Sequence, residues 1–107
     1  ALATLIDEGR VILIGPVRQE LLSGVRERAQ FETLRDHLRA FSDLPLETRH
    51  YERAAECFNE CRSRGIQGSH VDFLICAVAL AEDAAVFTTD RNFDHYTKPL
   101  GVRLYEG

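Results

Sequence analysis

Hydrophobic residues in this chain fall alternately into short apolar runs and longer stretches with helical spacing. Short runs typical of buried strands occur at 11–14, 85–88 and 102–104, and 44–46 is either a strand around Pro45 or a connector. The stretches with helical spacing are 16–23, 26–41, 48–64, 71–81 and 91–96. The opening segment 1–8 resembles the end of a helix closed by Gly9. This alternation predicts an α/β fold with a parallel sheet.

The spacing also predicts which side of each helix faces the core. In 26–41 the apolar stripe consists of Phe31, Leu34, Leu38 and Phe41. In 48–64, which Gly65 ends, the expected inner face consists of Tyr51, Ala54, Ala55, Phe58 and Cys61. The segment 71–81 is apolar nearly all round, which indicates a helix buried on most sides.

Size and charge narrow the possible functions. With 107 residues, the sequence suits one domain with a single hydrophobic core. Its net charge of -4 gives no overall attraction to nucleic acid, so a nucleic-acid site must depend on local features. No stretch is long and apolar enough to span a membrane, and no signal peptide is found. We therefore expect a cytoplasmic protein with no membrane partner.

The three cysteines do not have the spacing of a disulfide framework. Cys57 and Cys61 lie four residues apart in a helical pattern, and Cys76 lies in an apolar run. An odd number with this spacing predicts buried, reduced thiols. A zinc site that includes His50 would need the paired ligand spacing of zinc modules, which is absent.

Glu20 is the first of three acidic residues in unexpected positions. In the helix that begins at Pro16, it falls on the same apolar stripe as Val17 and Leu21. A carboxylate on such a stripe loses hydration unless something compensates for it, and a bound cation would do so. Alternatively, Glu20 is solvated at the rim, near a helix N-terminus whose dipole stabilises it.

Asp72 and Asp90 are the other two. Asp72 is the only charged residue in the apolar run 71–78, and it suits either a site or a capping box with Ser69 as the N-cap. Asp90 follows the strand expected at 85–88, and ligand sites of open α/β sheets gather beyond the carboxyl ends of strands. Asp90 is equally suited to be the N-cap of the helix expected at 91–96.

Together, the three carboxylates are more informative than any one of them. Each lies just after a strand or at a helix N-terminus, so one α/β topology can place all three at the same end of the sheet. Clustered carboxylates repel one another unless a cation neutralises them. Oxygen ligands without a paired His or Cys favour Mg²⁺ or Mn²⁺ over zinc. Such an ion can activate water and stabilise the charge on a phosphodiester under attack.

Four groups of short motifs extend over essentially the whole chain. They are GPVRQELLSG at 15–24, DLPL at 43–46 followed by YERAA at 51–55, RGI at 64–66 followed by VDFLICA at 71–77, and TTDRNF at 88–93. In their order and spacing they resemble the PIN-domain family, specifically its VapC-type toxins. The resemblance implies a three-layer α/β/α sandwich with a short parallel sheet.

The same resemblance implies a metal-dependent endoribonuclease, the toxin of a toxin–antitoxin pair. Glu20, Asp72 and Asp90 match the family's catalytic carboxylates and would bind one or two Mg²⁺ or Mn²⁺ ions, which activate water to cut RNA. Thr88, two residues before Asp90, would support the site. The resemblance also implies a homodimer, held inactive by a cognate antitoxin protein that inserts a peptide over the acidic groove.

Two features depart from the family's pattern. The family's first strand, which ends in a further metal-binding aspartate, has no counterpart in this sequence, so we expect a single PIN-like domain that is incomplete at its N-terminus. Asn92 stands where many relatives have another aspartate, and its amide oxygen can bind metal but adds no charge. The alternative function is therefore a catalytically decayed PIN-like module that binds other proteins.

Arg18 and Arg91 are the candidate RNA contacts, because they lie beside the proposed carboxylates in the sequence. Solvated surface arginine is the commoner role for each of them. An open α/β phosphatase or phosphotransferase would also place an aspartate after a strand. The chain has no nucleophile or phosphate-loop motif to support that third function.

Overall fold

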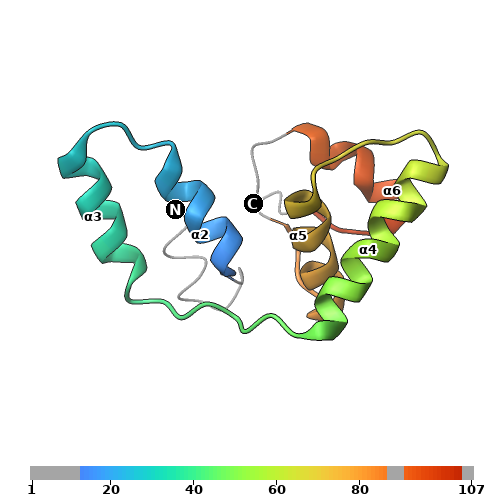
Figure 1. Ribbon diagram of the computed structural model, residues 1–107, viewed down its shortest axis with the longest axis horizontal. Coiled ribbons are helices and arrows are strands. Elements are labelled where there is room, and N and C mark those ends of the chain that lie inside the picture. The colour runs from blue at the N-terminus through green and yellow to red at the C-terminus, as the bar shows by residue number, and fades with distance from the viewer. Residues whose placement is uncertain (1–12, 87–90, 105–107) are drawn as a thin grey trace. The chain divides into compact units, whose positions relative to one another are not determined.

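The computed structural model describes residues 13–86 and 91–104 and divides the chain into two compact units (Figure 1). The first unit extends to Pro45 and the second begins at Leu46. The first contains α2 (Gly15–Ser23) and α3 (Arg28–Leu38). The second contains α4 (Thr48–Ser63), α5 (His70–Ala81), the 3-10 helix η1 (Arg91–Tyr96) and α6 (Thr97–Leu100).

Within the described residues, the helices expected from the sequence are present, with small changes at their ends. Pro16 lies in the first turn of α2, where its missing N–H costs no hydrogen bond. Gly65, with φ 75°, follows α4 in the left-handed conformation that ends helices. The segment 26–41 is helical only over Arg28–Leu38, and the turn at 91–96 is a 3-10 helix. The short helix α6 was not predicted.

The predicted inner face of α4 was wrong at two positions. Tyr51 is 54% exposed and Ala55 is also exposed. The side that faces the core is rotated so that it contains His50, Cys57 and Cys61, all fully buried, with Ala54 and Phe58 half-buried. The prediction missed this rotation because histidine is treated as a polar residue in a hydrophobic pattern. In the structure the His50 ring is buried and forms its hydrogen bonds inside the protein. It accepts one from the backbone N–H of Glu47 at 2.9 Å.

The core of the second unit lies between α4, α5 and the residues that follow them, and α4 and α5 lie side by side in Figure 1. A row of aromatic rings connects these elements. Phe58 of α4 meets Phe73 of α5 edge-on at 5.6 Å between centroids, and Phe73 lies 5.1 Å from Tyr96 of η1. Tyr96 in turn meets Phe93 edge-on at 5.2 Å. The row fixes η1 against α5.

The first unit is held together by Leu13, Ile14 and Leu38, which are buried, and by the guanidinium of Arg18. Arg18 extends from α2 to the end of α3. Its Nη1 donates to the carbonyl of Leu38 at 3.0 Å and its Nη2 to that of Phe41 at 2.6 Å. Leu38 is the last residue of α3 and Phe41 lies just beyond it, at a helix end where backbone acceptors lack partners within the helix.

No strand forms in the described part of the chain, which differs from the parallel sheet that we predicted. Residues 13–14 lead directly into α2. Ile14 is the N-cap of this helix, and its carbonyl accepts hydrogen bonds from the N–H groups of Val17 and Arg18. The segment 44–46 is a connector. Of the strands predicted at 85–88 and 102–104, one parallel bridge between Val86 and Leu104 is present, and Val86 N–H donates to Arg103 O at 2.7 Å. The expected helix end at 1–8 and residues 11, 12, 87 and 88 lie outside the described residues.

Among the helices that the structure describes, none combines the length and the apolar character that crossing a membrane requires.

Candidate functional site

Asp72 is the third residue of α5 and is half-buried. Its backbone N–H donates to Oγ of Ser69 at 3.0 Å, so Ser69 is the N-cap, as the sequence predicted. Its side chain accepts a hydrogen bond from the hydroxyl of Tyr96, with 3.0 Å between that oxygen and Oδ2. The position at the N-terminal end of α5 also stabilises the negative charge of Asp72. Capping by Ser69 therefore leaves the carboxylate of Asp72 available for another role.

Tyr96, the partner of Asp72, is fully buried. Its ring lies in the aromatic row between Phe73 and Phe93. Gly68, just before the N-cap of α5, leaves the space for the Tyr96 hydroxyl, because a Cβ at this position would collide with it. The structure thus places η1 beside the N-terminus of α5 through a buried side chain that directly contacts a candidate carboxylate.

Glu20 lies on α2, in the first unit, and its side chain is exposed. The structure does not show the partial desolvation that one of the two alternatives from the sequence gave this carboxylate, because α2 buries none of its residues fully and Val17 and Leu21 are only half-buried. The solvated alternative describes the position of Glu20. An exposed carboxylate remains able to bind a cation, since it gives up no buried partner to do so.

The remaining candidates lie in or just before η1. Asp90 and Thr88 fall outside the described residues. Asn92 is exposed in the first turn of η1, the 3-10 helix that ends at Tyr96. The structure therefore brings η1, which carries Asn92, to the N-terminus of α5, which carries Asp72.

The two arginines proposed to contact RNA have different surroundings. All three nitrogens of the Arg18 guanidinium are bonded, since Nε also donates to Oδ1 of Asp43 at 2.9 Å. These bonds give Arg18 a structural role at the end of α3. Arg91 is 93% exposed, with Nε 3.3 Å from Oδ2 of Asp94. A phosphate contact by either side chain stays a prediction.

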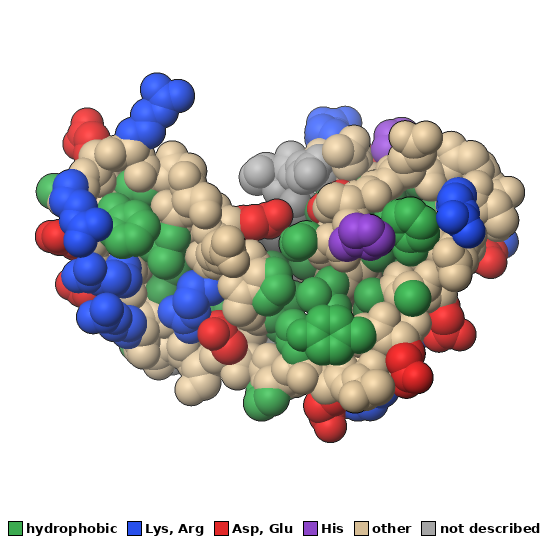
Figure 2. Space-filling model, in the orientation of Figure 1, with side chains coloured by type: hydrophobic (Ala, Val, Ile, Leu, Met, Phe, Trp, Pro, Cys, Tyr) green, Lys and Arg blue, Asp and Glu red, His purple; other side chains and the backbone are tan. Residues whose placement is uncertain are grey.

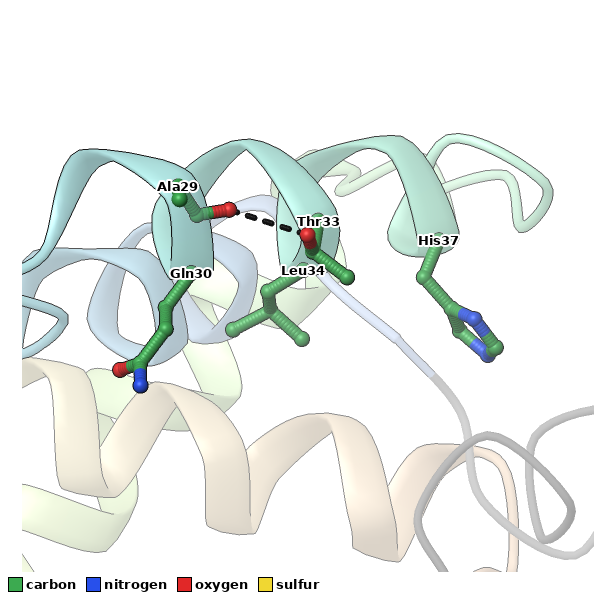
Figure 3. Close-up of a pocket in the computed structure, with 5 residues that line it drawn as sticks. All are labelled: Ala29, Gln30, Thr33, Leu34 and His37. Carbon is green, nitrogen blue, oxygen red and sulfur yellow. Dashed lines mark hydrogen bonds between the residues drawn. The ribbon is translucent and has the colours of Figure 1, made fainter.

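The charged surface of α3 does not form a basic patch. Figure 2 shows acidic and basic side chains interleaved there, and the ion pairs are Arg28–Glu32, Arg35–Asp36 and Arg39–Asp36. Figure 3 shows a pocket along another part of the same helix, lined by Ala29, Gln30, Thr33, Leu34 and His37. No candidate carboxylate lines this pocket, so it is separate from the proposed metal ligands.

The three cysteines are free and buried, as the spacing predicted. Burial raises the pKa of Cys57 and Cys61, and it raises that of Cys76 to about 12. These thiols therefore stay protonated near neutral pH, which makes them poor nucleophiles and poor metal ligands.

A family model describing the PIN domain matches residues 1–99 of the chain, which covers the first compact unit and most of the second. The chain belongs to the PIN-domain family. PIN domains are a nuclease family and are generally metal-dependent. No curated protein matches the sequence of this PIN domain.

The carboxylates of this PIN domain fit a hard divalent cation in their chemistry. Within the described residues, no hydrogen bond reaches Oδ1 of Asp72, and Glu20 has neither a hydrogen bond nor an ion pair. Both can therefore supply oxygen ligands of the kind that Mg²⁺ and Mn²⁺ prefer. The residues described do not by themselves gather three potential ligands at one point, and Asp90 is not among them.

Sequence reasoning missed two residues beside the PIN-domain carboxylate Asp72, namely Tyr96 and Gly68. Tyr96 lies three residues after Phe93 in a short helical turn, and this spacing places both rings on one side. That spacing indicated that Tyr96 is buried. It did not indicate that Asp72 is its hydrogen-bond partner, because Asp72 is 24 positions away in the sequence. Gly68 carried no signal, since its role depends entirely on the Tyr96 hydroxyl.

Proposed function

We propose that this PIN domain is a Mg²⁺- or Mn²⁺-dependent endoribonuclease of the VapC type, the toxin of a toxin–antitoxin pair. The observation that carries the proposal is the position of Asp72. Its carboxylate is half-buried at the N-terminus of α5, accepts a hydrogen bond on one oxygen, and lies in a chain that belongs to a nuclease family. A half-buried carboxylate whose other oxygen accepts no hydrogen bond among the described residues is suited to bind a hard divalent cation.

In this proposal Glu20, Asp72 and Asp90 provide the metal ligands and the catalytic charge. A bound divalent cation would activate water and neutralise charge on the phosphodiester. Asp72 contributes a carboxylate whose orientation is set by α5 and by Tyr96. Thr88 supports Asp90, and Asn92 offers an uncharged amide oxygen on η1. Arg91, which is exposed and follows Asp90 in the sequence, is the better suited of the two arginines to contact phosphate, because the guanidinium of Arg18 is already bonded.

The proposed fold and partners follow from the same assignment. A three-layer α/β/α sandwich with a short parallel sheet would use the Val86–Leu104 bridge as one contact between neighbouring strands. RNA is the proposed substrate. A homodimer and a cognate antitoxin that covers the acidic site are the proposed protein partners, in the cytoplasm.

The test is cleavage of total RNA that contains transfer RNAs, with Mg²⁺, Mn²⁺ or excess chelator in parallel reactions. The critical variant is Asp72→Asn. Its amide oxygen can still accept the hydrogen bond from Tyr96, so the change removes the charge and leaves the local structure in place. We expect discrete, metal-dependent cleavage by the parent protein and a loss of about 100-fold or more in the variant.

Asp36→Asn is the matched control, because Asp36 is an exposed carboxylate on α3 with only surface ion pairs. It should cleave like the parent. Equal cleavage by Asp72→Asn, or cleavage that persists in excess chelator, would contradict the proposal. No cleavage by a folded parent protein in either metal would instead favour the decayed, protein-binding PIN module.

A further inference from the structure

We propose that Tyr96 is a positioning residue for the metal ligand Asp72, through the hydrogen bond between the Tyr96 hydroxyl and Oδ2. In this arrangement Tyr96 holds one carboxylate oxygen, and Oδ1 is presented to the divalent cation. The inference depends on the proposed function, because it assumes that Asp72 binds the metal. It adds a residue outside the carboxylate set and assigns it a measurable effect on metal affinity.

The hydrogen bond restricts Asp72 in a specific way. A carboxylate on the first turn of a helix can rotate about its side-chain torsions, and each rotation moves both oxygens. The contact of 3.0 Å between the Tyr96 hydroxyl and Oδ2 selects one orientation. Within the described residues no hydrogen bond reaches Oδ1, so this oxygen remains available as a ligand.

Tyr96 can set this orientation because its own position is fixed. The residue is 0% exposed, and its ring contacts Phe73 and Phe93 at centroid distances of 5.1 and 5.2 Å. The space for its hydroxyl exists because residue 68 is glycine. Movement of the hydroxyl would require movement of the whole aromatic row, which is costly in a well-packed core.

Loss of the Tyr96 hydroxyl should affect the affinity for metal more than it affects the fold. A group that orients a metal ligand lowers the entropy that the ligand loses when the ion binds, and it keeps the donor atom aimed at the ion. Loss of such a partner weakens metal affinity or activity about 10- to 100-fold. The competing explanation is that Asp72 merely satisfies a buried tyrosine hydroxyl, which needs a hydrogen-bond partner in any protein. That explanation predicts an effect on stability and none on metal affinity.

Tyr96→Phe separates the two explanations, because it removes the hydroxyl and keeps the ring in the aromatic row. The measurement is the dissociation constant of Mn²⁺, obtained by calorimetry or from the electron paramagnetic resonance signal of free Mn²⁺. We expect Tyr96→Phe to raise this constant about 10- to 100-fold. Tyr51→Phe, the same change at a residue that is 54% exposed on α4, should leave it unchanged. An unchanged constant in Tyr96→Phe would overturn the inference.

Activity provides a second comparison. If Tyr96 only positions Asp72, excess Mn²⁺ should return RNA cleavage by Tyr96→Phe toward the parent rate, whereas Asp72→Asn should stay inactive at any Mn²⁺ concentration. Combining the two changes should weaken Mn²⁺ binding no further than Asp72→Asn alone, since the hydroxyl acts through the carboxylate. Weaker Mn²⁺ binding in the double variant than in Asp72→Asn would show that Tyr96 does not act through Asp72, which contradicts the inference.

A measurement on the parent protein covers the case in which Tyr96→Phe does not fold. The chain has three tyrosines and no tryptophan, so terbium luminescence excited near the tyrosine absorption reports a tyrosine close to the bound ion. We expect such emission in the parent and in Tyr51→Phe, its displacement by Mn²⁺, and its loss in Asp72→Asn. No sensitised emission at saturating terbium would overturn the inference.

Failure of this inference differs from failure of the proposed function. A parent that binds Mn²⁺ and cleaves RNA, together with a Tyr96→Phe variant of equal affinity, would leave the nuclease assignment intact and remove Tyr96 from the site. A folded parent that neither binds Mn²⁺ nor cleaves RNA would overturn both.

Discussion

The buried imidazole of His50 connects the start of α4 with the end of α5, because its Nε2 lies 3.4 Å from Oε1 of Glu82. Its Nδ1 accepts a hydrogen bond of 2.9 Å from the backbone N–H of Glu47. The neutral ring therefore carries its proton on Nε2 and donates it to Glu82. His50 is 1% exposed, so these two groups replace the water that its ring nitrogens would otherwise bind.

His50→Leu should destabilise the second unit. Leucine fills much of the same space but leaves the Glu47 N–H without its acceptor, and Glu82 keeps only the hydrogen bond from Arg49. We expect the free energy of unfolding to fall by about 1–3 kcal/mol, as measured by urea titration. His95→Leu, at an exposed position on η1, is the control and should have little effect. Equal stabilities of the two variants would show that the hydrogen bonds of His50 contribute nothing.

Arg18→Lys should destabilise the first unit even though it keeps the positive charge. The guanidinium makes three directed contacts, with Asp43 and with the carbonyls of Leu38 and Phe41, which a single ammonium group does not reproduce. We expect a loss of about 1–3 kcal/mol and faster amide hydrogen exchange at the end of α3.

Arg28→Lys is the matched control, because Arg28 forms an exposed ion pair with Glu32 on the same helix. Its effect should remain within about 0.5 kcal/mol. Unchanged exchange at the end of α3 in Arg18→Lys would contradict the structural role assigned to this residue.

The parts of the fold that the sequence predicted are those that depend on local signals. Pro16, Ser69 and Gly65 mark helix ends within a few residues of the backbone groups that they affect, and all three mark ends found in the structure. The inner face of α4 was predicted incorrectly, because a histidine with both ring nitrogens bonded behaves as a core residue. Strands depend on partners far away in the sequence, and the runs at 85–88 and 102–104 meet in one bridge among the described residues.

In the candidate site, too, the sequence predicted what depends on local signals and missed what depends on contacts between distant residues. The sequence identified Asp72 because a charge within an apolar helix is unusual, and it gave Ser69 as the cap from a spacing of three residues. It did not identify Tyr96, whose contact with Asp72 spans 24 positions and exists only after η1 packs against α5. The sequence left two alternatives open for Glu20, because its burial depends on what covers α2, which helical periodicity alone does not determine.

Gly68→Ala tests the close approach between Gly68 and Tyr96. The added Cβ would collide with the Tyr96 hydroxyl and lie 3.0 Å from Cζ of Phe73. We expect a loss of about 1–3 kcal/mol in unfolding free energy. Tyr96→Phe removes the most severe collision, so the double variant should be more stable than the sum of the two single losses.

Gly24→Ala is the control for that cycle, because nothing lies within 4 Å of a Cβ at this position. It should be close to neutral. Strict additivity of Gly68→Ala and Tyr96→Phe would mean that the new methyl group is accommodated elsewhere, and that Gly68 does not make room for the hydroxyl.

The Cys76 thiol should make the stability of the protein depend on alkaline pH. Burial raises its pKa from 9.0 to about 12, with smaller contributions from the nearby Cys57, Asp72 and Cys61. The folded state therefore keeps its proton at pH values where the unfolded state has lost it. The resulting stabilisation is complete below the unfolded pKa of 9.0 and is lost as the pH rises toward about 12.

Cys76→Ala removes this titrating group, so its unfolding free energy should fall less steeply with pH than that of the parent. The difference in slope should approach about 1.4 kcal/mol per pH unit above pH ~9. Urea titrations in a phosphine reductant, from about pH 8 to about pH 10, measure it while excluding disulfide formation. The thiol should also resist alkylation in the folded protein and react once urea unfolds it, since the thiolate is the nucleophile. Parallel pH profiles for parent and variant, or rapid alkylation without urea, would contradict a deeply buried, protonated Cys76.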